Sequence, residues 1–384
     1  MTLRNYLDKI KPNFEKGGKH EKLHSTFEAL ESFAYTPNKV TRKGSHIRDA
    51  VDMKRTMILV VIALLPALLF GMWNIGHQTA LAYPGTFADT FWHCFWFGFL
   101  KMLPLLVVSY VVGLGIEFLF AEIRHEEVSE GYLVSGLLIP MIVPVTIPLW
   151  QLALAVAFAV VIGKEVFGGT GMNFLNVALV ARAFLFFSYP TRMSGDNVWV
   201  ATPHHFTGDA VSGATPLGEL MAGSQPTSSA MDMFLGTIPG STCETSVLAI
   251  LIGAAMLLLT GIINWRILLA VALGGGLTGL LFNAIGANGY MQLPFYYHYL
   301  MGGFAFGAVF MATDPVTSAQ TACGKWIYGF LIGAFAVTLR VLNPAYPEGM
   351  MLAILLMNCF APLIDHLVVQ NNIKKRQKRA LATK

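Results

Sequence analysis

Long apolar runs follow one another from residue 56 to residue 368 of this 384-residue chain. Runs of this kind match the helix length needed to cross the hydrocarbon core of a bilayer, where the backbone must satisfy its own hydrogen bonds. Charged residues make up only 12% of the chain, against about 25% in a soluble domain. The sequence therefore predicts an all-α polytopic membrane protein.

The apolar runs predict about ten transmembrane helices, five on each side of a polar loop at 189–245. Pro140, Pro144 and Pro148 break the third and fourth segments. We interpret Phe91–Trp96 as an interfacial aromatic belt ahead of the second segment. The expected segments are 56–75, 100–121, 131–146, 149–166 and 173–188, then 246–263, 265–285, 298–313, 325–342 and 349–368.

The distribution of basic residues predicts the orientation of the chain. The loop 189–245 holds one of them, Arg192, whereas most of the others lie near the two ends. Positive charge is retained on the cytoplasmic side, so both termini are expected there and the loop outside. The expected regions are a cytoplasmic segment 1–55, a first five-helix repeat 56–188, an extracytoplasmic loop 189–245, a second five-helix repeat 246–369 and a basic cytoplasmic tail 370–384.

The spacing Gly-x4-Gly-x7-Pro occurs twice, from Gly131 to Pro144 and from Gly302 to Pro315. The two copies are five segments apart, so they would cross the membrane in opposite directions. Inverted repeats with broken helices build the central pathways of many transporters. The alternative is a chance match of Gly and Pro in two membrane helices.

The charge of the chain argues against nucleic acid as a partner, and its cysteines argue against a metal site. The net charge of +4 comes from basic residues at the ends of a membrane chain, which indicates membrane lipid and no nucleic acid as a partner. The four cysteines are scattered without a C-x-x-C pair. This argues against a zinc or iron–sulfur site built by this chain alone.

The sequence Ser212-Gly213-Ala214-Thr215 lies in the loop expected outside the membrane. The hydroxyl of Thr215 could accept a phosphoester, and Gly213 with Ala214 leaves the backbone uncrowded for a modifying enzyme. The alternative is an ordinary Ser/Thr/Gly turn.

A glycine-rich break at 168–171 precedes Asn173 and Asn176. Two amides three residues apart would share a helix face and could bind a polar ring with alternating donors and acceptors, such as isoalloxazine. The alternative is that Asn173 caps the following helix.

Four charged residues are expected inside the membrane: Glu117, Arg182, Arg340 and Asp365. Such residues usually face a pathway or a partner. Glu117 and Asp365 supply hard oxygen ligands that suit a small alkali cation. The alternative is a structural ion pair of these carboxylates with Arg182 or Arg340.

Two more charged residues lie near segment ends. Lys164 is expected to extend its ammonium to the interface. Asp314, next to Pro315, is expected to cap the helix break, in preference to lining a cation route.

Taken together, these motifs resemble the B subunits of the Na+-translocating NADH:quinone oxidoreductase, in the B/D-subunit family shared with the Rnf complex. The resemblance covers essentially the whole chain. It is carried by G-G-K-H-E-K (17–22), Y-T-P (35–37), S-H-I-R-D (45–49), K-E-V-F-G-G-T-G (164–171), N-F-L-N (173–176), A-R-A-F-L-F-F (181–187), S-G-A-T (212–215), G-G-F-A-F-G (302–307), M-A-T-D-P-V (311–316) and N-P-A-Y-P-E-G-M-M-L-A-I-L (343–355).

The resemblance implies two flavins. Thr215, in the motif that includes Ser212, Gly213 and Ala214, would carry FMN through a phosphoester installed outside by a flavin transferase. Asn173 and Asn176 would contact a noncovalent riboflavin near the cytoplasmic face.

The resemblance also implies quinone and sodium sites. Gly113 and Glu117 match a region linked to quinone-site inhibitors and to sodium, and Asp365 matches a further acidic residue linked to sodium. Family members can have a Gly-Gly pair where this chain has Gly113-Leu114. That difference bears on inhibitor sensitivity and not on the fold.

The implied function is that of a membrane redox subunit, inactive with NADH alone, that passes electrons from FMN to riboflavin to ubiquinone and couples this to Na+ translocation. It would work with the A, C, D, E and F subunits in a six-subunit complex of the bacterial inner membrane. Two alternatives are the D subunit of an Rnf-type complex and a secondary transporter or channel without a redox role. The motifs at 17–22 and 35–37 favour the quinone reductase, because the Rnf protein generally lacks the long N-terminal segment.

Overall fold

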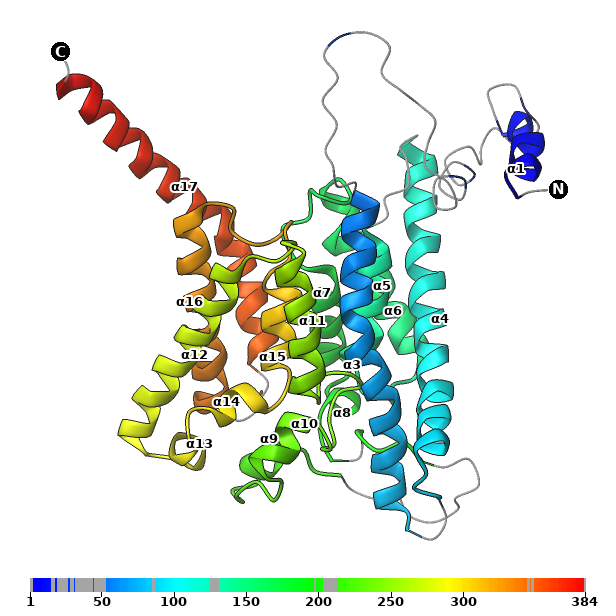
Figure 1. The fold of residues 1–384 in the computed structure, drawn as a ribbon, viewed down its shortest axis with the longest axis vertical. Coiled ribbons are helices and arrows are strands. Elements are labelled where there is room, and N and C mark those ends of the chain that lie inside the picture. The colour runs from blue at the N-terminus through cyan, green and yellow to red at the C-terminus, as the bar shows by residue number, and fades with distance from the viewer. Residues whose placement is uncertain are drawn as a thin grey trace.

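The computed structural model describes residues 3–14, 53–84, 87–124, 131–196, 198–202, 213–343 and 349–382, together with the single residues 18, 27, 31, 44 and 346. Regular secondary structure in these residues is entirely helical (Figure 1), as the sequence predicts. Ser212 and the motifs at 35–37 and 45–49 lie outside the described residues, as does the motif at 17–22 except for Gly18.

The ten expected segments correspond to helices or strings of short helices. Six described helices are long and apolar enough to span a bilayer. They are α3 (Met53–Ala82), α4 (Phe91–Arg124), α6 (Leu149–Gly163) with the adjoining turn η3 (Glu165–Phe167), α12 (Trp265–Ile285), α16 (Ala322–Leu342) and α17 (Met350–Ala382). Shorter apolar helices are α5 (Tyr132–Met141), α7 (Val177–Ser188) and α11 (Val247–Leu259). The segment expected at 298–313 consists of α14 (Tyr297–Leu300), α15 (Phe304–Phe306) and the π-helical η4 (Gly307–Met311).

Small helices complete the fold. In the amino-terminal segment these are α1 (Leu3–Ile10) and η1 (Lys11–Asn13). Between the membrane segments they are α8 (Pro190–Met193), α9 (Pro216–Met221), α10 (Ala230–Leu235) and α13 (Gly289–Gln292).

Helices α3, α4 and α17 extend well beyond the expected boundaries, and α3 continues to Ala82. The aromatic stretch at Phe91 is the first part of α4 and not a separate element. The basic tail likewise continues α17 without a break to Ala382. At about 1.5 Å per residue, the 34 residues of α4 and the 33 of α17 are each longer than a hydrocarbon core of about 30 Å, so both helices extend past it.

Successive membrane segments run in alternating directions (Figure 1). The start of α3 and the end of α17 lie at one end of the bundle, which we call the terminal end. Helices α8, α9 and α10 lie at the opposite end, which we call the loop end. Both ends of the membrane region are therefore on the same side, as ten crossings require.

Corresponding helices in the two halves pack against corresponding neighbours and run in opposite directions. Helix α6 packs against α4 and α7, and α16 packs against α12 and α17. Across the halves α3 packs against α11, and α7 against α17. Helix α5 runs from the terminal end toward the loop end, whereas α15 and η4 run the other way (Figure 1). This is the arrangement expected of an inverted repeat.

Glycines allow close helix contact between α12 and α16. A Cβ atom at Gly274 would lie 2.1 Å from the carbonyl oxygen of Phe330, and one at Gly333 would lie 2.1 Å from that of Val271. The two backbones therefore touch directly, as is common where small residues line membrane helix interfaces.

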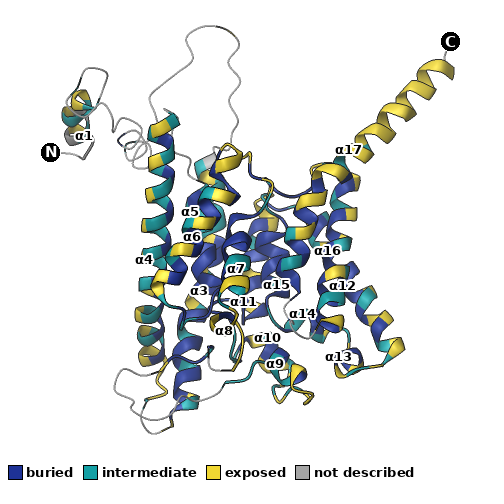
Figure 2. Ribbon diagram, turned by 180° about the vertical axis from the view of Figure 1, so that it is seen from behind, coloured by how far each residue is buried: buried dark blue, intermediate teal, exposed yellow. Residues whose placement is uncertain are grey.

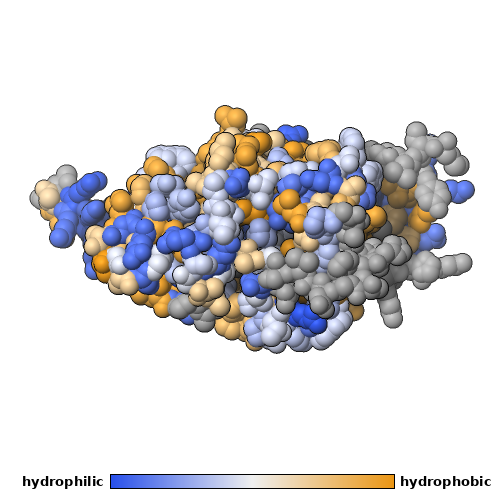
Figure 3. All heavy atoms as spheres, turned by 90° about the horizontal axis from the view of Figure 1, so that it is seen from below, coloured by the Kyte–Doolittle hydropathy of each residue, from blue (hydrophilic) through white to orange (hydrophobic). Residues whose placement is uncertain are grey.

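Burial separates a packed centre from an apolar exterior (Figure 2). Large exposed side chains on α12 include Leu269, Leu273, Leu277 and Leu281. Their spacing places them on one helix face, which suits lipid or another apolar surface. The face seen in Figure 3 is the loop end, where hydrophilic and hydrophobic residues are mixed.

Candidate functional site

Thr215 is the N-cap of α9 at the loop end. Its Oγ1 accepts a hydrogen bond of 3.0 Å from the backbone N–H of Gly218, and Pro216 occupies the first helical turn. The side chain is half-buried and lines a cavity of about 540 Å³, which we call the Thr215 cavity. Thr215 therefore borders a space large enough for a small molecule, which a simple surface turn would not provide.

Residues 237–246, which we call the strap, insert into the bundle. Six of them line the Thr215 cavity, and we call this part of its lining the floor: Ile238, Pro239, Gly240, Ser241, Glu244 and Thr245. The strap side chains from Ser241 to Ser246 are all buried. The N–H and the hydroxyl of Thr242 both donate to the carbonyl of Val143, and the N–H of Cys243 donates to that of Met141 at 3.0 Å. The last carbonyls of α5 have no intrahelical partner, so the strap supplies their donors. The expected extracytoplasmic loop is thus partly inside the protein.

An ion pair joins the strap to the first repeat. Nη1 of Arg182 on α7 lies 3.1 Å from Oε2 of Glu244 and also donates to the carbonyl of Ile142. Nη2 of Arg182 donates to the hydroxyl of Ser241 at 3.3 Å. The Arg182 and Glu244 side chains are only 2% and 3% exposed, so each charge depends on the other for its stability.

A second set of bonds joins the strap to α3. The Asn74 side chain donates to the carbonyl of Ile238 at 3.1 Å and to the hydroxyl of Thr245 at 3.3 Å. Gln78 in turn donates to Asn74 at 3.3 Å. The strap is therefore fixed from two sides by buried polar side chains.

Arg340 lies next to Gly302, which lines the Thr215 cavity. It is fully buried and donates to the carbonyls of His298 and Met301. The φ of Gly302 is +63°, which suits glycine. A Cβ atom there would lie 2.7 Å from Leu217, so the packing also requires glycine at this turn.

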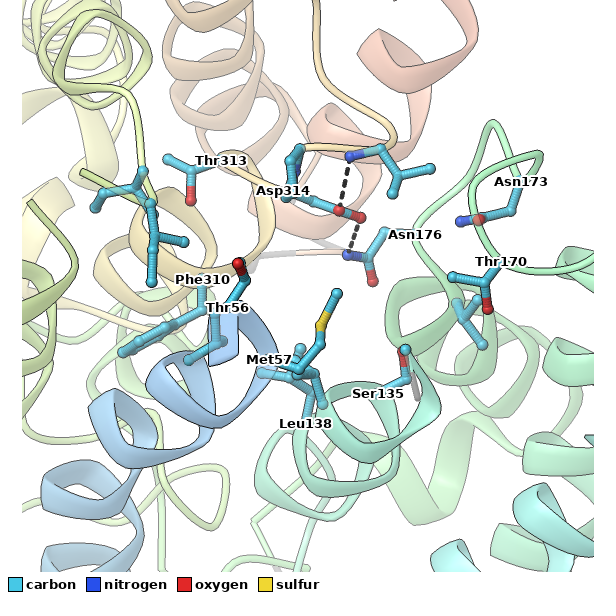
Figure 4. A pocket seen from close by; sticks show the side chains of 18 of the residues that line it. Thr56, Met57, Ser135, Leu138, Thr170, Asn173, Asn176, Phe310, Thr313 and Asp314 are labelled. Carbon is cyan, nitrogen blue, oxygen red and sulfur yellow. Dashed lines mark hydrogen bonds between the residues drawn. The ribbon is translucent and has the colours of Figure 1, made fainter. Parts of the chain in front are cut away.

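Asn173 and Asn176 line a second cavity, of about 110 Å³, at the terminal end (Figure 4). We call it the Asn176 cavity. The expectation that both amides share a helix face is wrong, because α7 begins at Val177 and both residues precede it. Asn176, and not Asn173, is the N-cap: its Oδ1 accepts from Ala178 and Leu179. The Asn173 amide donates to the carbonyl of Leu175 at 3.0 Å.

Asp314 of the second repeat also lines this cavity and lies next to Asn176 (Figure 4). Its carboxylate accepts from Nδ2 of Asn176 at 3.2 Å, and from the N–H of Val316 and the hydroxyl of Thr317 at 3.1 Å each. The bonds to Val316 and Thr317 cap the break after η4, so the predicted capping role is confirmed. The bond to Asn176 was not expected, since it joins residues 138 positions apart.

Lys164 does not extend to the interface as expected. It is 5% exposed and forms an ion pair with Glu117 of α4, which is 4% exposed. The other carboxylate oxygen of Glu117 is buried and receives no hydrogen bond from the described residues. Lys164 also lines the Asn176 cavity, so the structure brings Glu117 close to the two asparagines through this lysine.

Gly113 lies one helical turn before Glu117, on the buried face of α4. A Cβ atom at Gly113 would lie 1.9 Å from the ring of Tyr132, whose hydroxyl donates to the carbonyl of Ser109 at 3.0 Å. The glycine is therefore required by the packing of Tyr132 against α4. The neighbouring Leu114 is not part of this contact.

Asp365 is apart from both cavities. Its Oδ1 accepts from the N–H and the hydroxyl of Thr321 at 2.9 and 2.5 Å, and its Oδ2 accepts from the N–H of Gln320 at 2.6 Å. Thr321 in turn caps α16 through Gly324. Glu117 and Asp365 were expected to pair with Arg182 or Arg340 if structural, but Glu117 pairs with Lys164, Arg182 with Glu244, and Asp365 stabilises the start of α16.

No cluster of three or more His, Cys, Asp or Glu side chains that could hold a metal occurs among the described residues. The residues that sequence reasoning missed are those of the strap. A signal was present in Ser241-Thr242-Cys243-Glu244-Thr245-Ser246, a polar run directly before an apolar segment. Its burial could not be inferred without the partners on α3, α5 and α7.

Comparison with known proteins gives concordant matches. Residues 40–374 match the model of the NQR2, RnfD, RnfE family. The B subunit of the Na(+)-translocating NADH-quinone reductase of Chromohalobacter salexigens is 49% identical, over 100% of this chain and 98% of that protein. The proteins of the same name from Pseudomonas aeruginosa strain LESB58 and Azotobacter vinelandii are 48% and 49% identical, each over 99% of this chain and 100% of their own length.

Proposed function

Because the chain belongs to the NQR2, RnfD, RnfE family, we propose that it is the membrane redox subunit of a sodium-pumping NADH:quinone oxidoreductase. In this proposal it passes electrons from covalent FMN through riboflavin to ubiquinone and couples their transfer to Na+ translocation. NADH would be oxidised elsewhere in the complex. The A, C, D, E and F subunits and a flavin transferase are the proposed partners, in a bacterial inner membrane with both termini cytoplasmic.

The choice within the family rests on full-length similarity. The family model also covers the D subunit of Rnf-type complexes, which remains the alternative function. The relatives named as quinone reductase B subunits match at 48–49% identity over 99–100% of this chain. That coverage includes the N-terminal segment, which favours the quinone reductase.

One observation carries the proposal for FMN: Thr215 lines a cavity of the size of a ligand site. Its volume of about 540 Å³ lies within the roughly 300–1,000 Å³ usual for ligand sites. The walls combine apolar side chains, such as Phe186, Trp199 and Ile238, with a few polar groups on the strap. These residues fit a flavin, which would supply one-electron transfer when bound.

The chain's own contribution at this site would be attachment and shielding. Oγ1 of Thr215 would form the phosphoester, and α9 would hold it at the rim through Pro216 and Gly218. Gly213 and Ala214 are half-buried beside it. Phe186 and Trp199 would exclude water from the cavity walls.

The Asn176 cavity fits riboflavin in chemistry but not in size. Asn173, Asn176 and Thr170 offer hydrogen-bonding groups to the same space. Its volume of about 110 Å³ is below the usual range for a ligand site, so a whole isoalloxazine ring requires these walls to separate. We retain Asn173 and Asn176 as the proposed riboflavin contacts on this condition.

Gly113, Glu117 and Asp365 are the residues proposed for quinone and sodium. Gly113 and Glu117 form the proposed quinone region, and Glu117 with Asp365 the proposed sodium ligands. The buried oxygen of Glu117 without a donor among the described residues supports a ligand role. The hydrogen bonds that already occupy both oxygens of Asp365 favour a structural role for that carboxylate.

Flavin fluorescence in a denaturing gel tests the covalent site. The full chain is coexpressed with the flavin transferase, as wild type and as Thr215→Ala and Thr227→Ala. Thr227 is a matched control, since it is an exposed threonine near α9 that bonds to Glu219. We expect fluorescence from wild type and Thr227→Ala and none from Thr215→Ala. A dark wild type, or a bright Thr215→Ala, rejects the assignment.

A further inference from the structure

We propose that Ser241, Glu244 and Thr245 of the strap form the recognition surface for the imide edge of a flavin ring. The inference rests on the proposed attachment of FMN to Thr215. It adds the residues that would orient the ring inside the Thr215 cavity, on the side away from the attachment point.

The three side chains are buried and line the cavity together. Their exposed fractions are 5% for Ser241, 4% for Glu244 and 5% for Thr245. Buried polar groups that line a ligand cavity are the usual determinants of ligand orientation. The strap residues and Thr215 line the same cavity from different segments of the chain, which suits a ligand that is anchored by one segment and recognised by the other.

The hydrogen-bonding pattern of the floor is complementary to a flavin imide. That edge of isoalloxazine presents a carbonyl, an N–H and a second carbonyl, which is an acceptor–donor–acceptor order. An ionised carboxylate only accepts hydrogen bonds, whereas a hydroxyl can donate one. Glu244 would accept from the N–H, and the hydroxyls of Ser241 and Thr245 would donate to the carbonyls.

The hydrogen bonds already present favour an ionised Glu244 and leave the hydroxyl protons of Ser241 and Thr245 available to a ligand. Arg182, at 3.1 Å, favours the ionised form of Glu244. Ser241 accepts from Arg182 and Thr245 accepts from Asn74, each at 3.3 Å. No described residue accepts a hydrogen bond from either hydroxyl, so both protons remain to be donated to a ligand.

The floor is also rigid. A Cβ atom at Gly303 would lie 2.8 Å from Oε1 of Glu244, so the carboxylate is confined between this turn and Arg182. Thr242 and Cys243 fix the strap to the end of α5. Groups held in place before binding lose little entropy when the ligand arrives.

The recognition surface predicts shifts of opposite sign in the reduction potential of the attached flavin. Negative charge added to the ring on reduction is disfavoured by a nearby carboxylate and favoured by hydroxyl donors. Glu244→Gln should therefore raise the potential, whereas Ser241→Ala and Thr245→Val should lower it. We expect about a tenfold change in the reduction equilibrium, which is about 59 mV for one electron.

The test is a spectroelectrochemical titration of the full chain, purified after coexpression with the flavin transferase. Glu219→Gln is the matched control, because Glu219 is a carboxylate on α9 that bonds to Thr227 and does not line the cavity. Iodide quenching of the flavin fluorescence provides a second readout. The ring should be shielded relative to a flavinylated peptide.

The outcomes separate this inference from the proposal on which it rests. A protein without covalent flavin rejects the attachment at Thr215. A flavinylated protein in which Ser241→Ala and Thr245→Val match the control in potential overturns the recognition surface, as does quenching equal to that of the peptide. Ser241→Ala and Thr245→Val keep the Arg182–Glu244 pair, so they test the recognition surface even if Glu244→Gln fails to fold.

Discussion

The side-chain amide of Asn176 donates a hydrogen bond of 3.2 Å to the carboxylate of Asp314, and this bond joins the two inverted repeats at the terminal end. Asn176 thus serves three purposes at once: it caps α7, contacts the second repeat and lines a cavity. Variants at this position should affect both stability and ligand content.

We expect Asn176→Ala to destabilise the protein by about 1 kcal/mol, the usual cost of a lost N-cap, and to reduce its noncovalent riboflavin. Asn173→Ala should reduce riboflavin without this loss of stability, because Asn173 caps no helix. Asn288→Ala is a matched control that removes the N-cap of α13 at the loop end, away from this cavity (Figure 1). Thermal unfolding and chromatography of acid-extracted flavin measure the two effects. Wild-type riboflavin content in both Asn176→Ala and Asn173→Ala would contradict the assignment.

Glu117→Ala should be strongly destabilising, because it leaves the charge of Lys164 buried without its carboxylate partner. Breaking a buried ion pair in this way costs about 3–5 kcal/mol. The double variant with Lys164→Met should recover much of the lost stability. Thermal unfolding in detergent measures both proteins, and equal stability of the single variant and wild type would show that the pair is not structural.

A second measurement separates the structural role of Glu117 from its proposed sodium role. Glu117→Gln keeps the shape of the side chain and a hydrogen-bond acceptor for Lys164. Its sodium uptake in reconstituted complex should fall relative to the electron flux. Unchanged uptake per electron would exclude this carboxylate as a sodium ligand.

Asp365 and Thr321 should act as one unit in stability. Asp365→Ala removes the acceptor for two backbone N–H groups, and Thr321→Ala removes the N-cap of α16. Because the two side chains bond each other, their effects should be non-additive by about 0.5–3 kcal/mol. A double-mutant cycle in thermal or chemical unfolding measures this coupling. Strict additivity would show that the Thr321–Asp365 bond contributes nothing.

The orientation of the chain can be tested with single cysteines. In a background without Cys323 and Cys359, which are exposed, Met221→Cys on α9 should react with a membrane-impermeant thiol reagent in intact spheroplasts. Arg379→Cys on the extension of α17 should react only after permeabilisation. The reverse pattern would invert the proposed topology.

The membrane segments were predictable because their signal is local. A run of apolar residues of the right length has few alternatives in lipid, so all ten segments match helices or strings of helices in the structure. Boundaries were less predictable: the aromatic start of α4 and the basic end of α17 continue their helices outside the expected limits. Composition marks where a helix leaves the apolar region and not where the helix ends.

The site was less predictable because its polar contacts are distant in sequence. Lys164 pairs with Glu117, 47 residues away, and Arg182 with Glu244, 62 residues away. A charged residue near a segment end can extend to the interface or find a buried partner, and local sequence does not distinguish these outcomes. The strap illustrates the same point, since its burial depends on carbonyls freed at the end of α5.

The Thr215 cavity and the Asn176 cavity lie at opposite ends of the bundle, and this separation has an electrical consequence. An electron passing from the first to the second would move inward across most of the membrane potential. With the cytoplasm negative, a full crossing costs about 2.3 kcal/mol per 100 mV. This is the same sign and size of work as moving one Na+ outward. Redox transfer through this chain would therefore be electrogenic in itself, and would charge the membrane even in a turnover that moved no ion.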